Sequence, residues 1–269
     1  MSVLEAIGMM PYDFSPERLR CRDLAEELSD PRLTRCLMVR PGTFTPVGAQ
    51  VWLGCTSRNH VRLQGGRQML IEVAGVRVPV GRATQAARLV CEEYADDALY
   101  HHSVRSYFFG AAWAETRGLD FDRELFFVSA LLHDLALTPP FDSHTLSFEE
   151  AGGHLARVFT AGLGWPTERR DRAAELIVLH MRDDVAPEAD VESRLLQVGT
   201  SADVSGAGLE AFDASFRDAL VEAYPRLGFA KSFVHLFQGQ AERKPGCAAA
   251  ELVAGGWPER ALSNLLDQG

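Results

Sequence analysis

Two histidines and two aspartates of this chain lie in segments that have the apolar spacing of helices. His102 lies in "YHHSVRSYFFG", His133 and Asp134 are neighbours in "SALLHDLAL", and Asp203 lies in "GTSADVSG". Imidazole nitrogen and carboxylate oxygen together suit zinc, iron, manganese or cobalt. Side chains directed inward from several helices commonly build a metal site in the core of a helical bundle. These residues therefore predict a catalytic metal ion with open coordination positions.

The burial expected of Asp134 strengthens this prediction. A lone histidine on an apolar helix is more often a packed core residue than a metal ligand. An aspartate, however, is costly to bury unless a cation or a metal ion accompanies it. The leucines that surround Asp134 in the sequence are Leu131, Leu132, Leu135 and Leu137. The adjacent pair His133-Asp134 therefore favours the metal-site interpretation.

Helices must position these residues, and the sequence beyond residue 84 predicts them. Apolar residues recur there at spacings of three and four, which is typical of amphipathic helices. The predicted helical segments are 82–118, 122–138, 147–164, 166–182, 192–206, 209–223, 228–242 and 257–267. Residues 37–80 are instead rich in Val and Gly, and Gly65-Gly66 separates two short runs that could pair as a hairpin. We therefore expect a mainly α protein, with a helical, metal-binding domain over residues 85–269 and an N-terminal extension with a small β module over residues 1–84.

Composition limits the range of functions. The chain has 269 residues, of which 46% are hydrophobic, and a formal net charge of −10. The negative charge argues against nucleic acid and anionic membranes as partners. No apolar run approaches the roughly 20 residues of a membrane span, and no signal peptide is recognisable, so we expect a cytoplasmic protein. Its five scattered cysteines are expected to be reduced thiols. The expected partner is a small-molecule substrate, and a homo-oligomer is compatible with the sequence.

The ordered set His102, His133-Asp134 and Asp203 resembles the H…HD…D signature of the HD-domain metal-dependent hydrolase superfamily. The surrounding segments are similar in order and spacing to those of its cyanamide hydratase-like branch, namely "HHSVRSYFFG", "SALLHDLALT", "SFEEAGG", "IVLHM", "GTSADVSG", "YPRLGF" and "ERKPG". The resemblance extends over roughly residues 90–250 and leaves out residues 1–85. It implies an HD-domain helical bundle.

The resemblance also implies a metal-activated water as the reacting group. A divalent ion would be held by His102, His133, Asp134 and Asp203, with zinc as the first choice and iron, manganese or cobalt as alternatives. The ion would lower the pKa of a bound water towards about 7, and the resulting hydroxide would add to the carbon of a cyano group. Asp134 would also accept a hydrogen bond from this water. The expected reaction is hydration or hydrolysis of a small molecule, giving an amide or urea product.

Three further residues are candidates for catalysis beside this ion. Glu149 and His180 could transfer protons, and Arg105 could orient a ligand or contact the substrate. Each has a purely structural alternative. Arg105 could pair with a surface carboxylate such as Asp97 or Glu115, and Glu149 could be a carboxylate that only stabilises a helix N-terminus.

Three other functions stay open on the sequence alone. A phosphohydrolase acting on a nucleotide or phosphomonoester is disfavoured because Leu137 occupies the position where many such members carry a lysine. A dinuclear-iron oxygenase is indicated if His154 and His180 bind a second metal, although His154 could instead pair with Glu150 on one helix face. A non-catalytic sensor is the third alternative, in which the β module recognises a ligand or forms a dimer interface.

Overall fold

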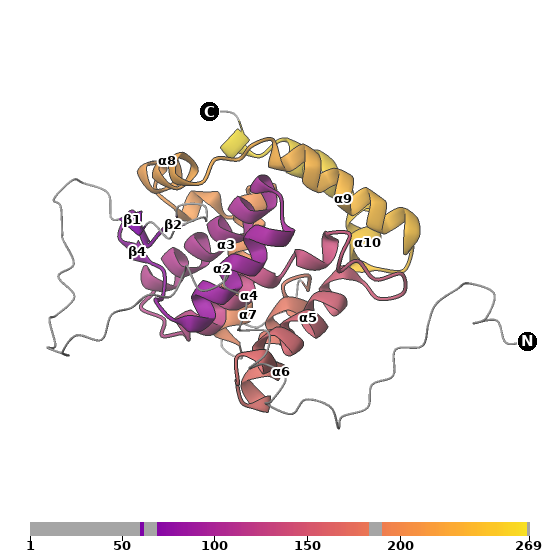
Figure 1. The fold of residues 1–269 in the computed structure, drawn as a ribbon. Helices are drawn as coiled ribbons and strands as arrows, with labels where there is room; N and C mark the ends of the chain where they lie inside the picture. Colours follow the sequence, from indigo (N-terminus) through magenta and orange to yellow (C-terminus); the bar gives the residue numbers. More distant parts are fainter. Residues whose placement is uncertain (1–59, 62–68, 183–189, 268–269) are drawn as a thin grey trace, which may run out of the picture. The chain divides into compact units, whose positions relative to one another are not determined.

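The computed structural model describes residues 60–61, 69–182 and 190–267 (Figure 1). Most of these residues are helical, which confirms the expectation of a mainly α protein. The helices are α2 (Arg82–Tyr94), α3 (Asp97–Glu115), α4 (Arg123–Leu132), α5 (Phe148–Gly162), α6 (Thr167–Leu179), α7 (Val191–Ser205), α8 (Ala214–Ala223), α9 (Phe229–Arg243), α10 (Ala248–Ala254) and α11 (Trp257–Leu262). None of the helices in these ranges is long and apolar enough to cross a membrane.

The described strands form two short antiparallel pairs. β1 (His60–Val61) pairs with β2 (Met69–Leu70), as the sequence predicted for the runs on either side of Gly65-Gly66, which itself lies outside the described residues. β3 (Glu72–Val73) pairs with β4 (Val76–Arg77) through a two-residue turn. Both turn residues, Ala74 and Gly75, have positive φ angles of 47° and 87°. This backbone matches the right-handed twist of a tight hairpin.

The second hairpin and the end of β2 pack on the helices and are not a separate module. The hydroxyl of Tyr107 in α3 donates a hydrogen bond to the Arg77 carbonyl at 2.7 Å, and the Leu70 amide donates to the hydroxyl of Tyr224 at 2.9 Å. Val73 and Val76 are buried in the same core as the helices. The domain boundary predicted at residue 84 therefore does not separate residues 69–80 from the helical domain. The rest of the predicted module, residues 1–59 and 62–68, lies outside the described residues.

Helix α3 is buried along most of its length and packs lengthwise against α7. Two glycines permit this close approach. A Cβ placed on Gly199 of α7 would lie 2.0 Å from the Ser106 carbonyl oxygen, and one on Gly110 of α3 would lie 2.5 Å from the Leu195 carbonyl oxygen. Because no side chain separates the two backbones, His102 on α3 and Asp203 on α7 can meet across the interface.

Aspartates at helix starts fix where the site-bearing helices begin. Asp96 accepts a hydrogen bond from the Leu99 amide in α3, and Asp122 accepts one from the Leu125 amide in α4. Asp190 accepts one from the Ser193 amide in α7. Each bond satisfies an amide that the helix itself leaves without a partner. The predicted segment 82–118 is accordingly two helices, which meet at Ala95 and Asp96.

Candidate metal centre

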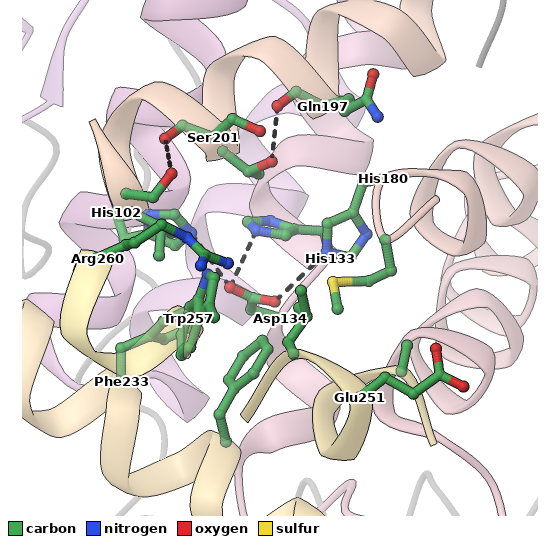
Figure 2. Close-up of a pocket in the computed structure, with 17 residues that line it drawn as sticks. His102, His133, Asp134, His180, Gln197, Ser201, Phe233, Glu251, Trp257 and Arg260 are labelled. Carbon is green, nitrogen blue, oxygen red and sulfur yellow. Dashed lines mark hydrogen bonds and ion pairs between the residues drawn. The ribbon is translucent and has the colours of Figure 1, made fainter. Parts of the chain in front are cut away.

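Three imidazole rings surround the carboxylate of Asp134 (Figure 2). Nε2 of His133 lies 3.0 Å and Nε2 of His102 lies 3.2 Å from Asp134 Oδ2, while Nε2 of His180 lies 4.0 Å from Oδ1. With metal–nitrogen bonds of about 2.1 Å, neighbouring ligands on one ion lie about 3 Å apart. His102, His133 and Asp134 can therefore bind the same ion, and all three side chains are buried.

The end of helix α4 explains how adjacent residues can face one ion. Consecutive helical residues point about 100° apart, but α4 ends at Leu132 and His133 is its C-cap. Asp134 has φ −106° and ψ 1°, outside the helical region, and a 3-10 turn follows over Leu135–Leu137. The predicted helix 122–138 is thus shorter in the structure. Its early end turns the Asp134 side chain back towards His133.

Hydrogen bonds at Nδ1 orient each of the three rings. Nδ1 of His133 lies 2.7 Å from the Ala130 carbonyl, and Nδ1 of His180 bonds to the Ile177 carbonyl. A carbonyl oxygen only accepts, so Nδ1 carries the proton in both rings. Nε2 is then left with a lone pair, the form in which a neutral imidazole binds a metal ion.

Several acceptor atoms at this centre have no hydrogen-bond donor among the described residues. They are Nε2 of His102, Nε2 of His133 and both carboxylate oxygens of Asp134. Buried acceptors that face one another without a donor are costly. A divalent cation would satisfy them together, so this donor set fits the metal ion that the sequence predicted.

The pKa values at the centre reflect this charge arrangement. Burial, with His133 nearby, lowers the pKa of His180 to about 4, which keeps its ring neutral at physiological pH. Burial alone would raise the pKa of Asp134, but His133 and His102 hold it well below its usual range. For His102 burial lowers the pKa, but the carboxylates of Asp134 and Asp203 outweigh it and raise the pKa.

Asp203 does not join the cluster, which differs from its predicted role as the fourth ligand. Its Oδ2 accepts from Nδ1–H of His102 at 2.7 Å and from Nη2 of Arg105 at 2.9 Å. Its Oδ1 accepts from Nε of Arg105 at 2.6 Å and lies 3.2 Å from Nη1 of Arg226. Both oxygens are thus engaged on the side of the His102 ring that faces away from Asp134. This geometry orients His102 and fixes its tautomer.

Arg105 acts through Asp203 and does not reach the cavity. Its guanidinium is buried, and besides Asp203 it donates to the carbonyl oxygens of Tyr224 and Pro225 at 2.9 and 3.1 Å. This arrangement is compatible with an orienting role, which stays a prediction. Arg105 contacts neither the cavity nor the predicted surface partners, Asp97 and Glu115, in the described part of the chain.

Of the two candidates for a second metal, the structure brings only His180 to the centre. His154 is exposed on α5. The order of histidines along a sequence does not fix the direction in which a helical side chain points. The exposed position of His154 therefore does not support it as a metal ligand.

Glu149 is buried at the start of α5, and its Oε2 has no partner among the described residues. One turn later, a Cβ on Gly152 would lie 3.2 Å from the His133 carbonyl oxygen, so this end of α5 packs against the turn that carries the centre. Glu149 does not line the cavity described below. A role in proton transfer stays a prediction for this residue.

The centre lies in a cavity of about 440 Å³. One wall is a polar stripe on α7, made by Gln197, Thr200, Ser201 and Ser205. The opposite wall is aromatic and consists of Phe233, Phe237 and Trp257, while Glu251 and Arg260 are charged residues that also line the cavity. None of these cavity-lining residues was predicted from the sequence. The spacing offers one signal for the polar stripe, because Gln197, Ser201 and Ser205 recur every four residues and so share one face of α7.

Comparison with known proteins agrees with this geometry. The HD domain family matches residues 99–204, a span that holds His102, His133, Asp134 and Asp203. The cyanamide hydratases DDI2 and DDI3 of Saccharomyces cerevisiae are each 30% identical to this chain over 171 residues, which cover 60% of this chain and 75% of each relative. The chain is therefore an enzyme of the HD-domain superfamily of metal-dependent hydrolases and belongs to its cyanamide hydratase-like branch.

Proposed function

We propose that this protein hydrates the cyano group of a small molecule at a single divalent metal ion, for which zinc is the first choice. The observation that carries the proposal is the buried group of acceptors on His102, His133 and Asp134 that lack a hydrogen-bond donor. The names of the two yeast relatives favour a cyano substrate. The exposed position of His154 favours one ion over two.

In this proposal His102, His133 and Asp134 hold the ion, and His180 is a neutral imidazole next to them. When bound, the ion would lower the pKa of a water and polarise the cyano group. Asp134 presents Oδ2 to His102 and His133 and leaves Oδ1 on the side of His180. Oδ1 can accept the proton that the attacking water loses and return it to the cyano nitrogen. The carbon–oxygen bond forms as one carbon–nitrogen π bond breaks, and the resulting imidic acid becomes the amide.

Phosphomonoester hydrolysis is the second candidate. One observation argues against it and another favours it. Leu137, at the position of the lysine found in many phosphohydrolases, is buried in the core, and no lysine of the described residues lines the cavity. Arg260, however, brings one cation to the cavity, where it could meet a phosphate. Release of inorganic phosphate distinguishes the two reactions.

The test combines metal content with turnover. Purified wild type, Asp134→Ala and the control His154→Ala are compared for metal equivalents per chain and for urea formed from cyanamide. We expect about one equivalent of metal in the wild type and the control, and loss of both metal and urea formation in Asp134→Ala. Retention of full metal by Asp134→Ala would refute the site. About two equivalents of iron in the wild type would instead support a dinuclear iron site and the oxygenase alternative.

A further inference from the structure

The cavity is much larger than cyanamide. A molecule of one carbon and two nitrogens fills about the liquid volume of two waters, on the order of 60 Å³. The cavity measures about 440 Å³, which lies within the range of pockets that bury larger organic ligands. A substrate as small as cyanamide would leave most of the two walls without contact.

The aromatic wall is continuous from the metal centre outward. The His102 ring lies 5.2 Å from Phe233, Phe233 lies 4.8 Å from Phe237, and Phe237 stacks on Trp257 at 4.5 Å, all measured between ring centroids. Phe233 and Phe237 lie on successive turns of α9, and Trp257 is the first residue of α11. Their mutual contacts hold these rings in place, so the wall is a preformed apolar surface beside the reacting group.

Arg260 follows Trp257 by one turn of α11 and lines the same cavity. Figure 2 shows its guanidinium directed into the cavity, while the carboxylate of Glu251 points away from the histidines. Among the described residues no carboxylate forms an ion pair with Arg260, and its side chain is bonded only to the Gly255 carbonyl at 3.2 Å. An arginine with free N–H groups at the end of an aromatic wall can bind a carboxylate or a phosphate.

We infer that the substrate is larger than cyanamide and carries an aromatic or other apolar part, which packs on Phe233, Phe237 and Trp257, and an anionic group, which binds Arg260. This inference rests on the proposed function for the identity of the reacting group. The shape and charge of the substrate follow from the cavity alone.

The experiment measures binding of probes that contain no cyano group, by calorimetry on the full chain as purified with its metal. Phenylacetamide, phenylacetate and benzylphosphonate share one benzyl group and differ in charge, and acetate lacks the ring. Each is titrated into the wild type, Arg260→Gln and the control Arg157→Gln. Arg157 is an exposed arginine of α5 that pairs with Asp171 outside the cavity, so its loss should matter little.

We expect the wild type and Arg157→Gln to bind phenylacetate about tenfold more tightly than phenylacetamide, and Arg260→Gln to bind the two about equally. Acetate should bind at least about tenfold more weakly than phenylacetate. The comparison of phenylacetate with benzylphosphonate shows whether carboxylate or phosphate is the better anion.

Two results would overturn the inference. Equal binding of phenylacetate and phenylacetamide by the wild type would show that the cavity has no site for an anion. A preference for phenylacetate that survives in Arg260→Gln would place the anion elsewhere, for example on the metal ion. Because the probes are not turned over, their binding does not depend on the cyano chemistry. Intact Arg260-dependent binding, with no hydration of cyanamide or of 4-(cyanomethyl)benzoate, which carries a cyano group, a ring and a carboxylate, would refute the proposed function alone.

Discussion

Replacement of Gly199 by alanine should force helices α3 and α7 apart. The added Cβ would lie 2.0 Å from the Ser106 carbonyl oxygen and 2.9 Å from its carbon, whereas ordinary contacts begin near 3.4 Å. Relief of the closest contact thus requires a separation of about 1.4 Å, the difference between 3.4 and 2.0 Å. Both obstacles are backbone atoms, so no side-chain rotation can remove the clash.

The expected destabilisation follows from two opposing terms. Overpacking against backbone should cost about 3 kcal/mol, and the better helix propensity of alanine should return about 1 kcal/mol. The net loss of about 2 kcal/mol corresponds to a Tm lowered by about 4–8 °C in a domain of this size. Metal occupancy should fall as well, because the hydrogen bond between His102 and Asp203 crosses the same interface.

A matched control isolates the clash from the change in propensity. Gly239 lies within α9, and a Cβ there would meet no atom within 4 Å. Gly239→Ala should therefore stabilise the protein by about 0.5–1 kcal/mol. Thermal unfolding followed by circular dichroism, with elemental analysis on the same samples, measures both variants. A rise in Tm for Gly199→Ala similar to that for Gly239→Ala would refute the close helix approach.

Three further outcomes are expected. Asp203→Asn keeps the shape of the side chain but removes the charge that holds His102, so metal affinity should fall about 10- to 100-fold in a chelator competition; unchanged affinity would contradict the orienting role. Asp190→Ala removes the N-cap of α7 and should cost about 1 kcal/mol near neutral pH in urea unfolding. Burial alone would raise the pKa of Asp190, but Arg172 and Ser193 hold it below its usual value, so this stabilisation is present above about pH 4 and disappears as the pH falls through the lowered pKa. The wild type and Asp190→Ala should then converge in acid, and a constant difference would exclude the ionised cap. Removal of the metal with a chelator should lower the Tm, because an ion that binds only the folded chain at about 1,000 times its Kd contributes about 4 kcal/mol; an unchanged Tm would show that the ion is not bound in the folded core.

The sequence predicts those features of the metal centre that depend only on residue type and burial. Asp134 among leucines had to be buried, and a buried carboxylate needs a cation. The side of the His102 ring on which Asp203 lies could not be predicted in the same way. That placement depends on the distance and rotation between α3 and α7. These are set by the close backbone contacts at Gly110 and Gly199 and by the ion pairs of Asp203 with Arg105 and Arg226.

The substrate cavity was harder to predict than the centre. Phe233 and Phe237 have the four-residue spacing of any core-facing helix, so the sequence does not distinguish a cavity wall from a packed interior. In the sequence, Arg260 cannot be distinguished from any surface arginine near the end of a short helix. Helix positions were predicted well wherever apolar residues recur regularly, but the ends at Leu132 and at Ala95 depend on tertiary packing and on capping by Asp96.

The hydrogen bond between His102 and Asp203 joins residues that are 101 positions apart in the chain. Closing so long a loop is slow, and the contact forms only after α3 and α7 have docked. The ion therefore meets a cavity that folding has already shaped, and local segments of the nascent chain cannot capture it in the native geometry. His, Asp and Glu sites bind several divalent ions in a fixed order of affinity, so the ion that this protein carries depends on which one is available when folding is complete.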